Sequence, residues 1–371
     1  MNFDMRISNY QLFALLVMHS LGSSTLFARG VEVKQNAWVM ELISLTMGFG
    51  VIWIHTELQK SYPRKNLAEI NITLFGKVFG GVLTVLFAGY FMWISSLNFS
   101  EFSELISITA LQTTPILAIQ CIFILVIIYF TFKNIEVIAR TSEILMPYVM
   151  LSLILLYILI AVSGKIDLKE LQPVLANGIK PVLKKAFPEY AAFPYGENVV
   201  FLMYYCYVNK SDDIRKYAFS AIFMLGSVLF ISTTTIVTVL GVEFTASSTI
   251  PLVEVIRLIG IGDIITNIDA IGVIVIFIGG FFKAMLFFYG SVLALSTLFK
   301  IKREVMIVVM AVFLIWFNLI KIPSFVYHRF LATEFTDIYL HQIYTIYVPF
   351  LLLVVIKLKN LNKRKDNSIW K

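Results

Sequence analysis

The sequence predicts an all-α polytopic membrane protein with about ten transmembrane helices. Of the 371 residues, 59% are hydrophobic and 14% are charged, whereas a soluble domain carries roughly 25% charged residues. The apolar residues form long runs, because Val78–Ser100 and Ile144–Val162 contain no charged residue. A helix needs about 20 such residues to cross the hydrocarbon core of a bilayer. These runs indicate a single membrane domain inserted into a lipid bilayer, without a soluble domain.

The order of the helices follows from the apolar runs and the polar segments between them. We expect spans at Tyr10–Phe27, Ala37–Glu57, Val78–Asn98, Pro115–Phe132, Glu143–Val162, Glu189–Val208, Tyr217–Val242, Ile264–Phe299, Val305–Ile320 and Ile338–Ile356. The first span is expected to be retained, because it lacks the cleavage site of a signal peptide. Lys65–Phe75 and Ile250–Ile259 are predicted as short interfacial helices, and Asp167–Lys185 as a broken amphipathic loop with two prolines.

The positive charge of the chain is explained by its orientation in the membrane. The net charge is +7 and the pI is about 9.2, values that in a soluble protein would indicate a nucleic-acid partner. Here the Lys and Arg residues are concentrated in alternate loops and in the tail from Lys357. Cytoplasmic loops carry the excess of Lys and Arg in membrane proteins. We therefore predict that both termini are cytoplasmic and that no nucleic acid is bound.

Motifs for catalysis and metal binding are missing from the sequence. It contains no GxSxG, no HExxH and no phosphate-binding glycine-rich loop, and its four histidines lie in separate regions. Cys121 and Cys206 lie within apolar segments and predict neither a disulfide nor a metal site. No clear set of a carboxylate and hydroxyl groups indicates a sodium site. The sequence therefore predicts a protein that is not an enzyme and holds no cofactor or metal.

Two of the expected spans are interrupted by residues that break helices. In the first span, Leu21–Thr25 (LGSST) places a small polar group inside an apolar stretch. In the sixth span, Phe193–Asn198 (FPYGEN) combines a proline, a glycine and a carboxylate. Proline removes a backbone donor and glycine tolerates strained dihedral angles, so both helices should unwind there. Unwound backbone is tolerated at membrane depth only where it is buried in protein or lines a cavity.

The positions of these breaks indicate a binding site. Spans one and six each open a set of five spans, and five spans invert the second set relative to the first. Interrupted spans at corresponding positions of two halves point to a transporter-type site near the bilayer midplane. Free N–H groups of the half-helices suit a carboxylate and exposed carbonyls suit an ammonium group, so a zwitterionic amino acid fits both. Taken singly, Gly22 is equally typical of close helix packing, and Pro194 of a helix kink.

The break in the sixth span carries a family resemblance. Phe193–Phe201 (FPYGENVVF) resembles the signature of the B subunits of bacterial spore germinant receptors. Ile7–Gln11 followed by Leu21–Gly22 resembles the first span of that family, and the likeness extends over essentially the whole chain. The sequence departs from the family at Ser23–Ser24, where many members carry Gly-Thr, and at Ala28–Gly30, where a proline is usual.

The resemblance implies both a fold and a function. The family belongs to the amino acid–polyamine–organocation superfamily, so it implies a leucine-transporter-like five-plus-five inverted repeat with broken helices 1 and 6. Members are thought to sense nutrients such as amino acids in the spore inner membrane, together with A and C subunits. The expected division is 1–163 for the first repeat, 164–188 for an external amphipathic loop, and 189–371 for the second repeat with its basic cytoplasmic tail.

Two ionisable residues inside the expected spans are candidates for ligand or proton binding. Glu197 lies at the break in span six, and Lys283 lies about 21 Å along a helix from Asp269. Charged side chains at membrane depth need a partner and mark functional sites, so we expect Glu197 to pair with Lys283 in preference to Glu143. The alternatives are that Glu197 only caps free backbone N–H groups and that Lys283 forms a purely structural ion pair.

The candidate ligand-binding residues come from both breaks and from two neighbouring helices. They are Gly22, Ser23, Ser24, Thr25, Tyr90, Trp93, Phe193, Tyr195, Gly196, Glu197, Lys283 and Phe287. Tyr90 and Trp93 share a helical face that would wall the pocket, although aromatic packing explains them equally well. His19 and His55 are more typical of hydrogen-bonded core histidines.

The sequence therefore predicts the nutrient-sensing membrane subunit of a spore germinant receptor, which binds a small nutrient, an amino acid, between the two breaks. The ligand would shift a pre-existing equilibrium between open and occluded states, and the partner subunits would respond to that shift. The alternatives are a proton-coupled amino acid permease that uses the same site and a structural membrane scaffold. Receptor and permease share the fold and the pocket, so the residues alone do not separate them.

Overall fold

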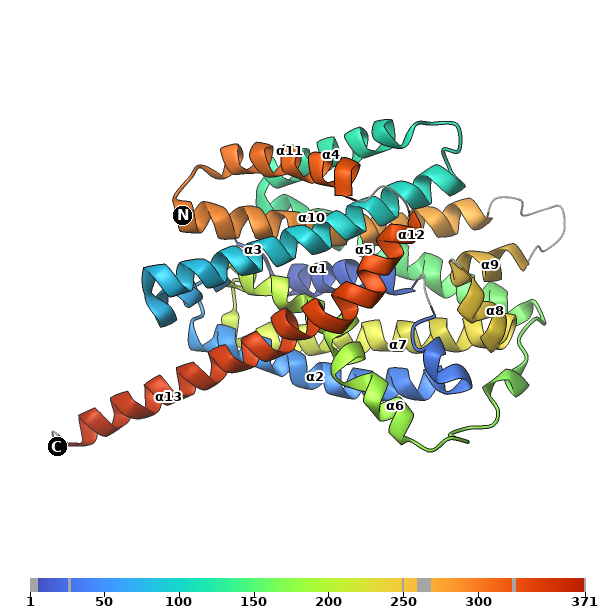
Figure 1. Ribbon diagram of the computed structural model, residues 1–371, viewed down its shortest axis with the longest axis horizontal. Helices are drawn as coiled ribbons and strands as arrows, with labels where there is room; N and C mark the ends of the chain where they lie inside the picture. The colour runs from blue at the N-terminus through green and yellow to red at the C-terminus, as the bar shows by residue number, and fades with distance from the viewer. Residues whose placement is uncertain (1–5, 26–27, 249, 259–267, 322–324, 370–371) are drawn as a thin grey trace.

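A computed structural model describes residues 6–25, 28–248, 250–258, 268–321 and 325–369. The regular secondary structure of the described residues is helical. The helices run mostly along the long axis of an elongated bundle (Figure 1). Within the described ranges, seven helices are long and apolar enough to cross a membrane, and α4 (Ile116–Phe132) is a shorter apolar helix. Together with two broken spans, they account for the expected spans of an integral membrane protein.

The first half of the bundle follows the expected order. Its helices are α1 (Asn9–Leu21), α2 (Ala37–Ser61), α3 (Leu67–Thr109), α4 and α5 (Asn134–Val162). Ser8 caps α1 by accepting a hydrogen bond from the Gln11 backbone, and the Gln11 side chain accepts one from the Ser8 backbone. Asn66 and Glu69 form the same reciprocal cap on α3. These caps satisfy backbone donors that have no partner within the first turn of a helix.

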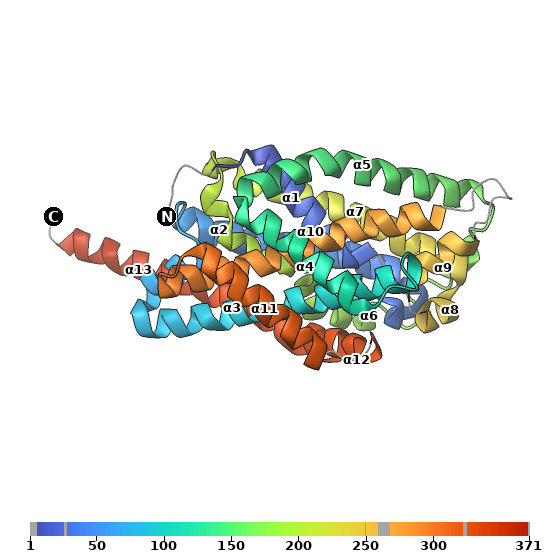
Figure 2. The same ribbon diagram turned by 90° about the horizontal axis from the view of Figure 1, so that it is seen from above.

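The second half contains the other broken span and four further spans. Its elements are η4 (Ala186–Tyr195), η5 (Gly196–Met203), η6 (Tyr205–Tyr207), α7 (Ile214–Leu240), α10 (Ile268–Phe299), α11 (Arg303–Lys321), α12 (Phe325–Phe330), η9 (Leu331–Leu340), η10 (Ile343–Tyr347) and α13 (Val348–Ile369). The short helices α8 (Val242–Ser247) and α9 (Pro251–Leu258) lie at one end of the bundle, and α6 (Lys180–Lys185) lies between that end and the middle (Figures 1 and 2). The end of α13 projects beyond the opposite end.

The first break lies where α1 meets α10. The α-helix ends at Leu21, Gly22 has φ −44° and ψ −91°, and a single short turn, η1 (Ser23–Thr25), follows. A Cβ atom on Gly22 would lie 2.7 Å from the backbone nitrogen of Gly280. Only glycine permits this close contact between the backbones of α1 and α10. Gly22 therefore both ends the helix α1 and allows it to pack closely on α10.

The second break lies in the sixth span at Phe193, which has the extended dihedral angles φ −125° and ψ 128°. Gly196, three residues later, packs directly against the last span, because an added Cβ would lie 2.5 Å from Thr345 Oγ1. Around the break, the chain from Tyr190 to Tyr205 is almost fully buried. The structure therefore confirms that both predicted interruptions are unwound and buried in protein.

Two of the predicted boundaries are wrong, whereas the short helix expected at Lys65–Phe75 is present. It begins at Leu67, within α3, and non-helical Gly76 (φ 76°, ψ −179°) separates it from the third span, on which it folds back so that Gly80 packs against the Asn71 backbone. The third span itself runs to Thr109, well beyond the expected end at Asn98. The last span begins at Phe325 instead of Ile338, because π-helical turns continue its helix. The predicted helix at Ile250–Ile259 is present as α9, although Ile259 is outside the described residues. The division into 1–163, 164–188 and 189–371 stays a prediction.

Candidate functional site

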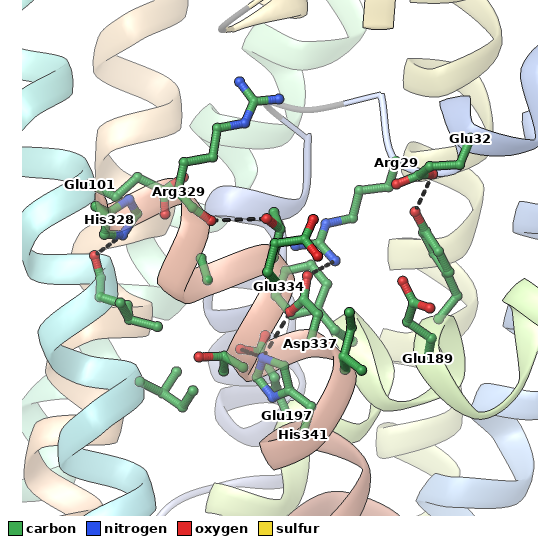
Figure 3. Close-up of a pocket in the computed structure, with 18 of the residues that line it drawn as sticks. Arg29, Glu32, Glu101, Glu189, Glu197, His328, Arg329, Glu334, Asp337 and His341 are labelled. Atoms are coloured by element: carbon green, nitrogen blue, oxygen red, sulfur yellow. Dashed lines mark hydrogen bonds and ion pairs between the residues drawn. The ribbon is translucent and has the colours of Figure 1, made fainter. Parts of the chain in front are cut away.

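A cavity of about 260 Å³ lies between the segment after the first break, α3, the second break and the last span. It is on the side of the breaks that faces α6, and the side chains around it are shown in Figure 3. Its lining residues are Ala28, Arg29, Val31, Glu32, Ile94, Leu97, Asn98, Glu101, Lys185, Glu189, Tyr190, Phe193, Glu197, His328, Arg329, Ala332, Thr333, Glu334, Thr336, Asp337, Ile338 and His341. The second break thus contributes Phe193 and Glu197 to the lining, whereas the first break is represented only by the segment that follows it, from Ala28.

The lining of the cavity is predominantly acidic. Among the described lining residues, six carry carboxylates and three carry a Lys or Arg side chain. Glu101 and Glu197 are both buried, at 8% and 2% exposure, so their charges are poorly screened by water. A cavity with an excess of one sign of charge favours a ligand group of the opposite sign. This cavity therefore suits an ammonium group.

Glu197 and Lys283 form a fully buried ion pair at the inner end of the cavity. Lys283 Nζ lies 2.5 Å from Glu197 Oε2, and Lys283 has no exposed surface. The same ammonium group is 4.4 Å from the centre of the Phe193 ring, which favours a cation over its face. The preferred pairing of Lys283 with Glu197 is confirmed, and Glu143 instead accepts a hydrogen bond from Gln11. Glu197 reaches the cavity, whereas Lys283 lies behind it.

A second ion pair crosses the cavity from the segment after the first break to the last span. Arg29 Nη1 lies 3.1 Å from Asp337 Oδ2, as Figure 3 shows. The guanidinium also stacks on Phe193, with Cζ 3.4 Å from the ring centre. Arg29 and Lys283 therefore lie near the same aromatic ring, which belongs to the second break. Three segments far apart in the sequence are joined by these contacts.

His341 connects the two ion pairs. Its Nε2 lies 3.3 Å from Asp337 Oδ1 and 3.7 Å from Glu197 Oε1. Its Nδ1 lies 2.8 Å from the hydroxyl of Tyr90, which also stacks on Tyr344. The resulting chain of contacts runs from Arg29 to Lys283 through the last span and the second break. Any group that enters the cavity and bonds to one member will change the balance of the others.

Several predicted site residues support this cluster without lining the cavity. Tyr90 contacts His341, and Trp93 Nε1 donates to Thr336 Oγ1 at 2.8 Å. Phe287 packs between Tyr90 and His19, whose ring lies 5.1 Å from it. Of the twelve predicted residues, Phe193 and Glu197 line the cavity itself. The aromatic residues Tyr90, Trp93 and Phe287 therefore form its support, and their part in ligand binding stays a prediction.

The residues predicted at the two breaks have different surroundings. Gly22 contacts α10, and Thr25 Oγ1 donates to the Leu21 carbonyl. Ser24 is buried, while the side chain of Ser23 is outside the described residues. At the second break, the Tyr195 ring packs on Gly48 of α2, pointing away from the cavity. Gly196 contacts Thr345 of the last span. These contacts position the breaks, and none of the side chains lines the cavity.

Sequence reasoning missed Arg29, Glu101, Asp337 and His341. The best available signal was Asp337 and His341, which are four residues apart and so share a helical face, within an otherwise apolar region. His55 behaves as a core histidine, with Nε2 2.7 Å from the Thr345 carbonyl oxygen. No group of three or more His, Cys, Asp or Glu residues in the described part of the chain is arranged to hold a metal ion.

Solved structures share the fold of this chain. MhsT in complex with L-phenylalanine superimposes with a TM-score of 0.67 at 16% identity, covering 96% of this chain and 99% of MhsT. Mhp1, a nucleobase-cation-symport-1 family transporter in a closed conformation with bromovinylhydantoin bound, gives a TM-score of 0.65 at 15% identity, covering 90% and 76% of the two chains. The predicted leucine-transporter-like fold, a five-plus-five inverted repeat with broken helices 1 and 6, is thereby confirmed.

Sequence relatives identify the family. Spore germination protein KB of Bacillus subtilis (strain 168) is 30% identical over 364 residues, which are 98% of this chain and 97% of that protein. Spore germination protein A2 of the same organism is 24% identical over 368 residues and 96% of each chain. The profile of the family described as spore germination protein matches residues 6–326. With most of its length matched by that profile, the chain belongs to the spore germination protein family.

Proposed function

We propose that the chain is the nutrient-sensing membrane subunit of a spore germinant receptor and that an amino acid binds in the cavity between Arg29 and Glu197. The observation that carries the proposal is the position of buried, oppositely charged groups around one cavity, which lies between the second helix break and the segment that follows the first. A carboxylate of the ligand would bond to Arg29, and an ammonium group would bond to Glu197 or Asp337. Arginine suits a carboxylate because its planar fork matches the two oxygens.

The comparisons support an amino acid as the ligand class. MhsT, which shares the fold, was solved in complex with L-phenylalanine. The relatives of higher identity over nearly the whole chain are spore germination proteins. Binding would loosen the pair between Arg29 and Asp337 and shift an existing equilibrium between open and occluded forms. We place the protein in the spore inner membrane with both termini cytoplasmic, where A and C subunits would respond to the shift.

The alternative is a proton-coupled amino acid permease that uses the same cavity. It is supported by the transporter fold, since Mhp1 is a transporter with a ligand bound. In a permease the cavity would open alternately to each side of the membrane, whereas in a receptor its occupancy alone would be the signal. The two functions therefore differ in whether solute crosses the membrane and in whether germination depends on the chain.

Deletion of the gene separates the two functions. Spores without the chain would be exposed to a panel of single amino acids and sugars, and vegetative uptake of the same solutes would be measured. We expect one nutrient to stop triggering germination while uptake is unchanged. Complementation with Asp337→Asn should fail to restore the response, whereas Glu304→Gln, at a carboxylate whose side chain is 51% exposed, should restore it. Unchanged germination with reduced uptake of one solute would establish the permease instead.

A further inference from the structure

The buried carboxylates of the cavity differ in whether a cation balances them. Glu197 pairs with Lys283, and Asp337 pairs with Arg29 at 3.1 Å. Glu101, on α3, also lines the cavity and is 8% exposed, yet it takes part in none of the ion pairs that the described residues form. A charged side chain at membrane depth is costly unless another group compensates it. Glu101 is therefore the buried carboxylate whose charge is left for a ligand to balance.

The positive side chains of the lining do not pair with Glu101. Lys185 pairs with Glu189 at 3.1 Å, and Arg29 is engaged in the pair described above. Figure 3 shows the guanidinium of Arg329 directed away from the Glu101 carboxylate, and no hydrogen bond or ion pair is drawn to Glu101. Two neutral pairs and one unmatched carboxylate give the buried groups of the cavity one negative charge in excess.

A neutral hydrogen-bond acceptor accompanies Glu101 on the same face of α3. Asn98 precedes it by three residues, lines the cavity and is 5% exposed. Its Nδ2 donates to the Ile94 carbonyl oxygen at 2.8 Å, whereas its Oδ1 has no hydrogen-bond partner within the described residues. Buried polar atoms normally find a partner. A carboxylate and an amide oxygen thus lie one helical turn apart, and both accept hydrogen bonds.

The cavity has room for a side chain that ends at these two acceptors. Ile94 and Glu101 both line it, and at about 1.5 Å per residue they are roughly 10 Å apart along α3. The volume of about 260 Å³ equals that of roughly nine water molecules at ~30 Å³ each. This space holds more than the carboxylate and ammonium groups that every amino acid carries.

We propose that the cavity selects an amino acid with a positively charged side chain, whose terminal ammonium or guanidinium group binds to Glu101 and Asn98. The inference rests on the proposed function, in which Arg29 binds the ligand carboxylate and Glu197 or Asp337 binds its α-ammonium group. Such a ligand carries one positive charge more than a zwitterion and so balances the unmatched carboxylate. Hydrogen bonds between charged groups are stronger than neutral ones. A neutral amino acid would fill the same space and leave Glu101 unpaired, which lowers its affinity.

The test compares two ligands that differ in one charged group. L-Lysine and L-norleucine share an unbranched side chain, and norleucine lacks the terminal ammonium group. Each is titrated into the purified full-length chain in lipid nanodiscs at fixed pH and ionic strength, with L-alanine and L-phenylalanine completing the panel. A ligand that binds only the folded state raises the unfolding temperature as its concentration passes its dissociation constant. We expect the dissociation constant of L-lysine to be at least about tenfold lower than that of L-norleucine, which corresponds to about 1.4 kcal/mol.

Matched variants assign the preference to the two acceptors on α3. Glu101→Gln should weaken lysine binding about tenfold and leave norleucine binding unchanged, so the ratio of the two dissociation constants approaches one. Asn98→Ala should lower the ratio by a smaller factor, and it decides the question if Glu101→Gln does not fold. Glu104→Gln changes a carboxylate on the next turn of α3, outside the lining of the cavity, and should keep the wild-type ratio.

The outcomes separate this inference from the proposed function. A neutral amino acid that binds as tightly as lysine, or a wild-type ratio in the folded variants at Glu101 and Asn98, overturns the selection of a positively charged side chain. Either result leaves amino acid binding in the cavity standing. If none of the four amino acids raises the unfolding temperature of the wild type, the inference and the amino acid ligand of the proposed function are both overturned.

Discussion

The ion pair between Glu197 and Lys283 provides the sharpest test of the buried charge network. The perturbation is Lys283→Met, which keeps a long apolar side chain and leaves Glu197 buried without its cation. Removing one partner of a buried pair costs about 3–5 kcal/mol, because the remaining charge is uncompensated. Among the ion pairs of the described residues, Glu197 then keeps the one with His341 Nε2, at 3.7 Å, so we expect a loss within that range. The double variant Lys283→Met/Glu197→Gln removes both charges and should regain most of the stability.

Equilibrium unfolding of the four proteins in mixed micelles measures the coupling between the two residues. The double-mutant cycle gives an interaction energy that is large only if the pair acts as a unit. Germination of spores that carry the double variant then separates structure from recognition. A stable but unresponsive double variant assigns ligand recognition to the charges, while a stable and responsive one makes the pair purely structural. A Lys283→Met protein as stable as the wild type, or a double variant no better than the single one, would refute the reasoning.

Three further predictions concern the breaks and the cavity. Gly22→Leu should abolish the nutrient response while the protein stays in the membrane, because the leucine side chain would collide with the Gly280 backbone. The control Gly89→Ala, whose new Cβ has no atom within 4 Å, should respond normally. Spore germination and membrane immunoblots measure response and membrane content for both variants. Arg29→Lys loses the planar stacking on Phe193 and should raise the nutrient concentration for half-maximal germination at least about tenfold; an unchanged dose response would count against the site. Tyr90→Phe removes the hydroxyl at His341 and should weaken the response by about 0.5–1.5 kcal/mol, whereas Tyr129→Phe, on a ring that is 59% exposed, should leave it unaltered.

The unwound helices were predictable because their causes are local. Gly22 and the Pro194–Gly196 pair interrupt apolar spans, and the backbone chemistry of glycine and proline acts wherever the chain packs. The pairing of Lys283 with Glu197 was predictable from depth alone, since few other charges reach the middle of the bundle. These inferences needed residue types and distances along a helix, but no knowledge of how helices face one another.

The rest of the cluster depended on contacts that a linear pattern does not contain. The apolar pattern places Asp337 one residue before the expected last span at Ile338, although the helix already begins at Phe325. Arg29 follows the expected end of the first span at Phe27, so the apolar pattern does not assign it to the site. The direction of Tyr195 follows from the irregular backbone of the break and from the space left by Gly48, neither of which the sequence specifies. The sequence places the site between the two breaks, whereas the cavity is lined by the second break and by the segment after the first.

The last span links the cavity to the far end of the molecule. Its helical backbone continues without a gap from residue 325 to residue 369, although its winding alternates between α and π. Asp337 contacts Arg29 near one end, and Lys359 Nζ donates to the Leu74 carbonyl just before the kink at Gly76. At about 1.5 Å per residue the two contacts are roughly 33 Å apart. The span can therefore act as a lever, so that a small tilt at Asp337 displaces the short first segment of α3 at the opposite end of the bundle.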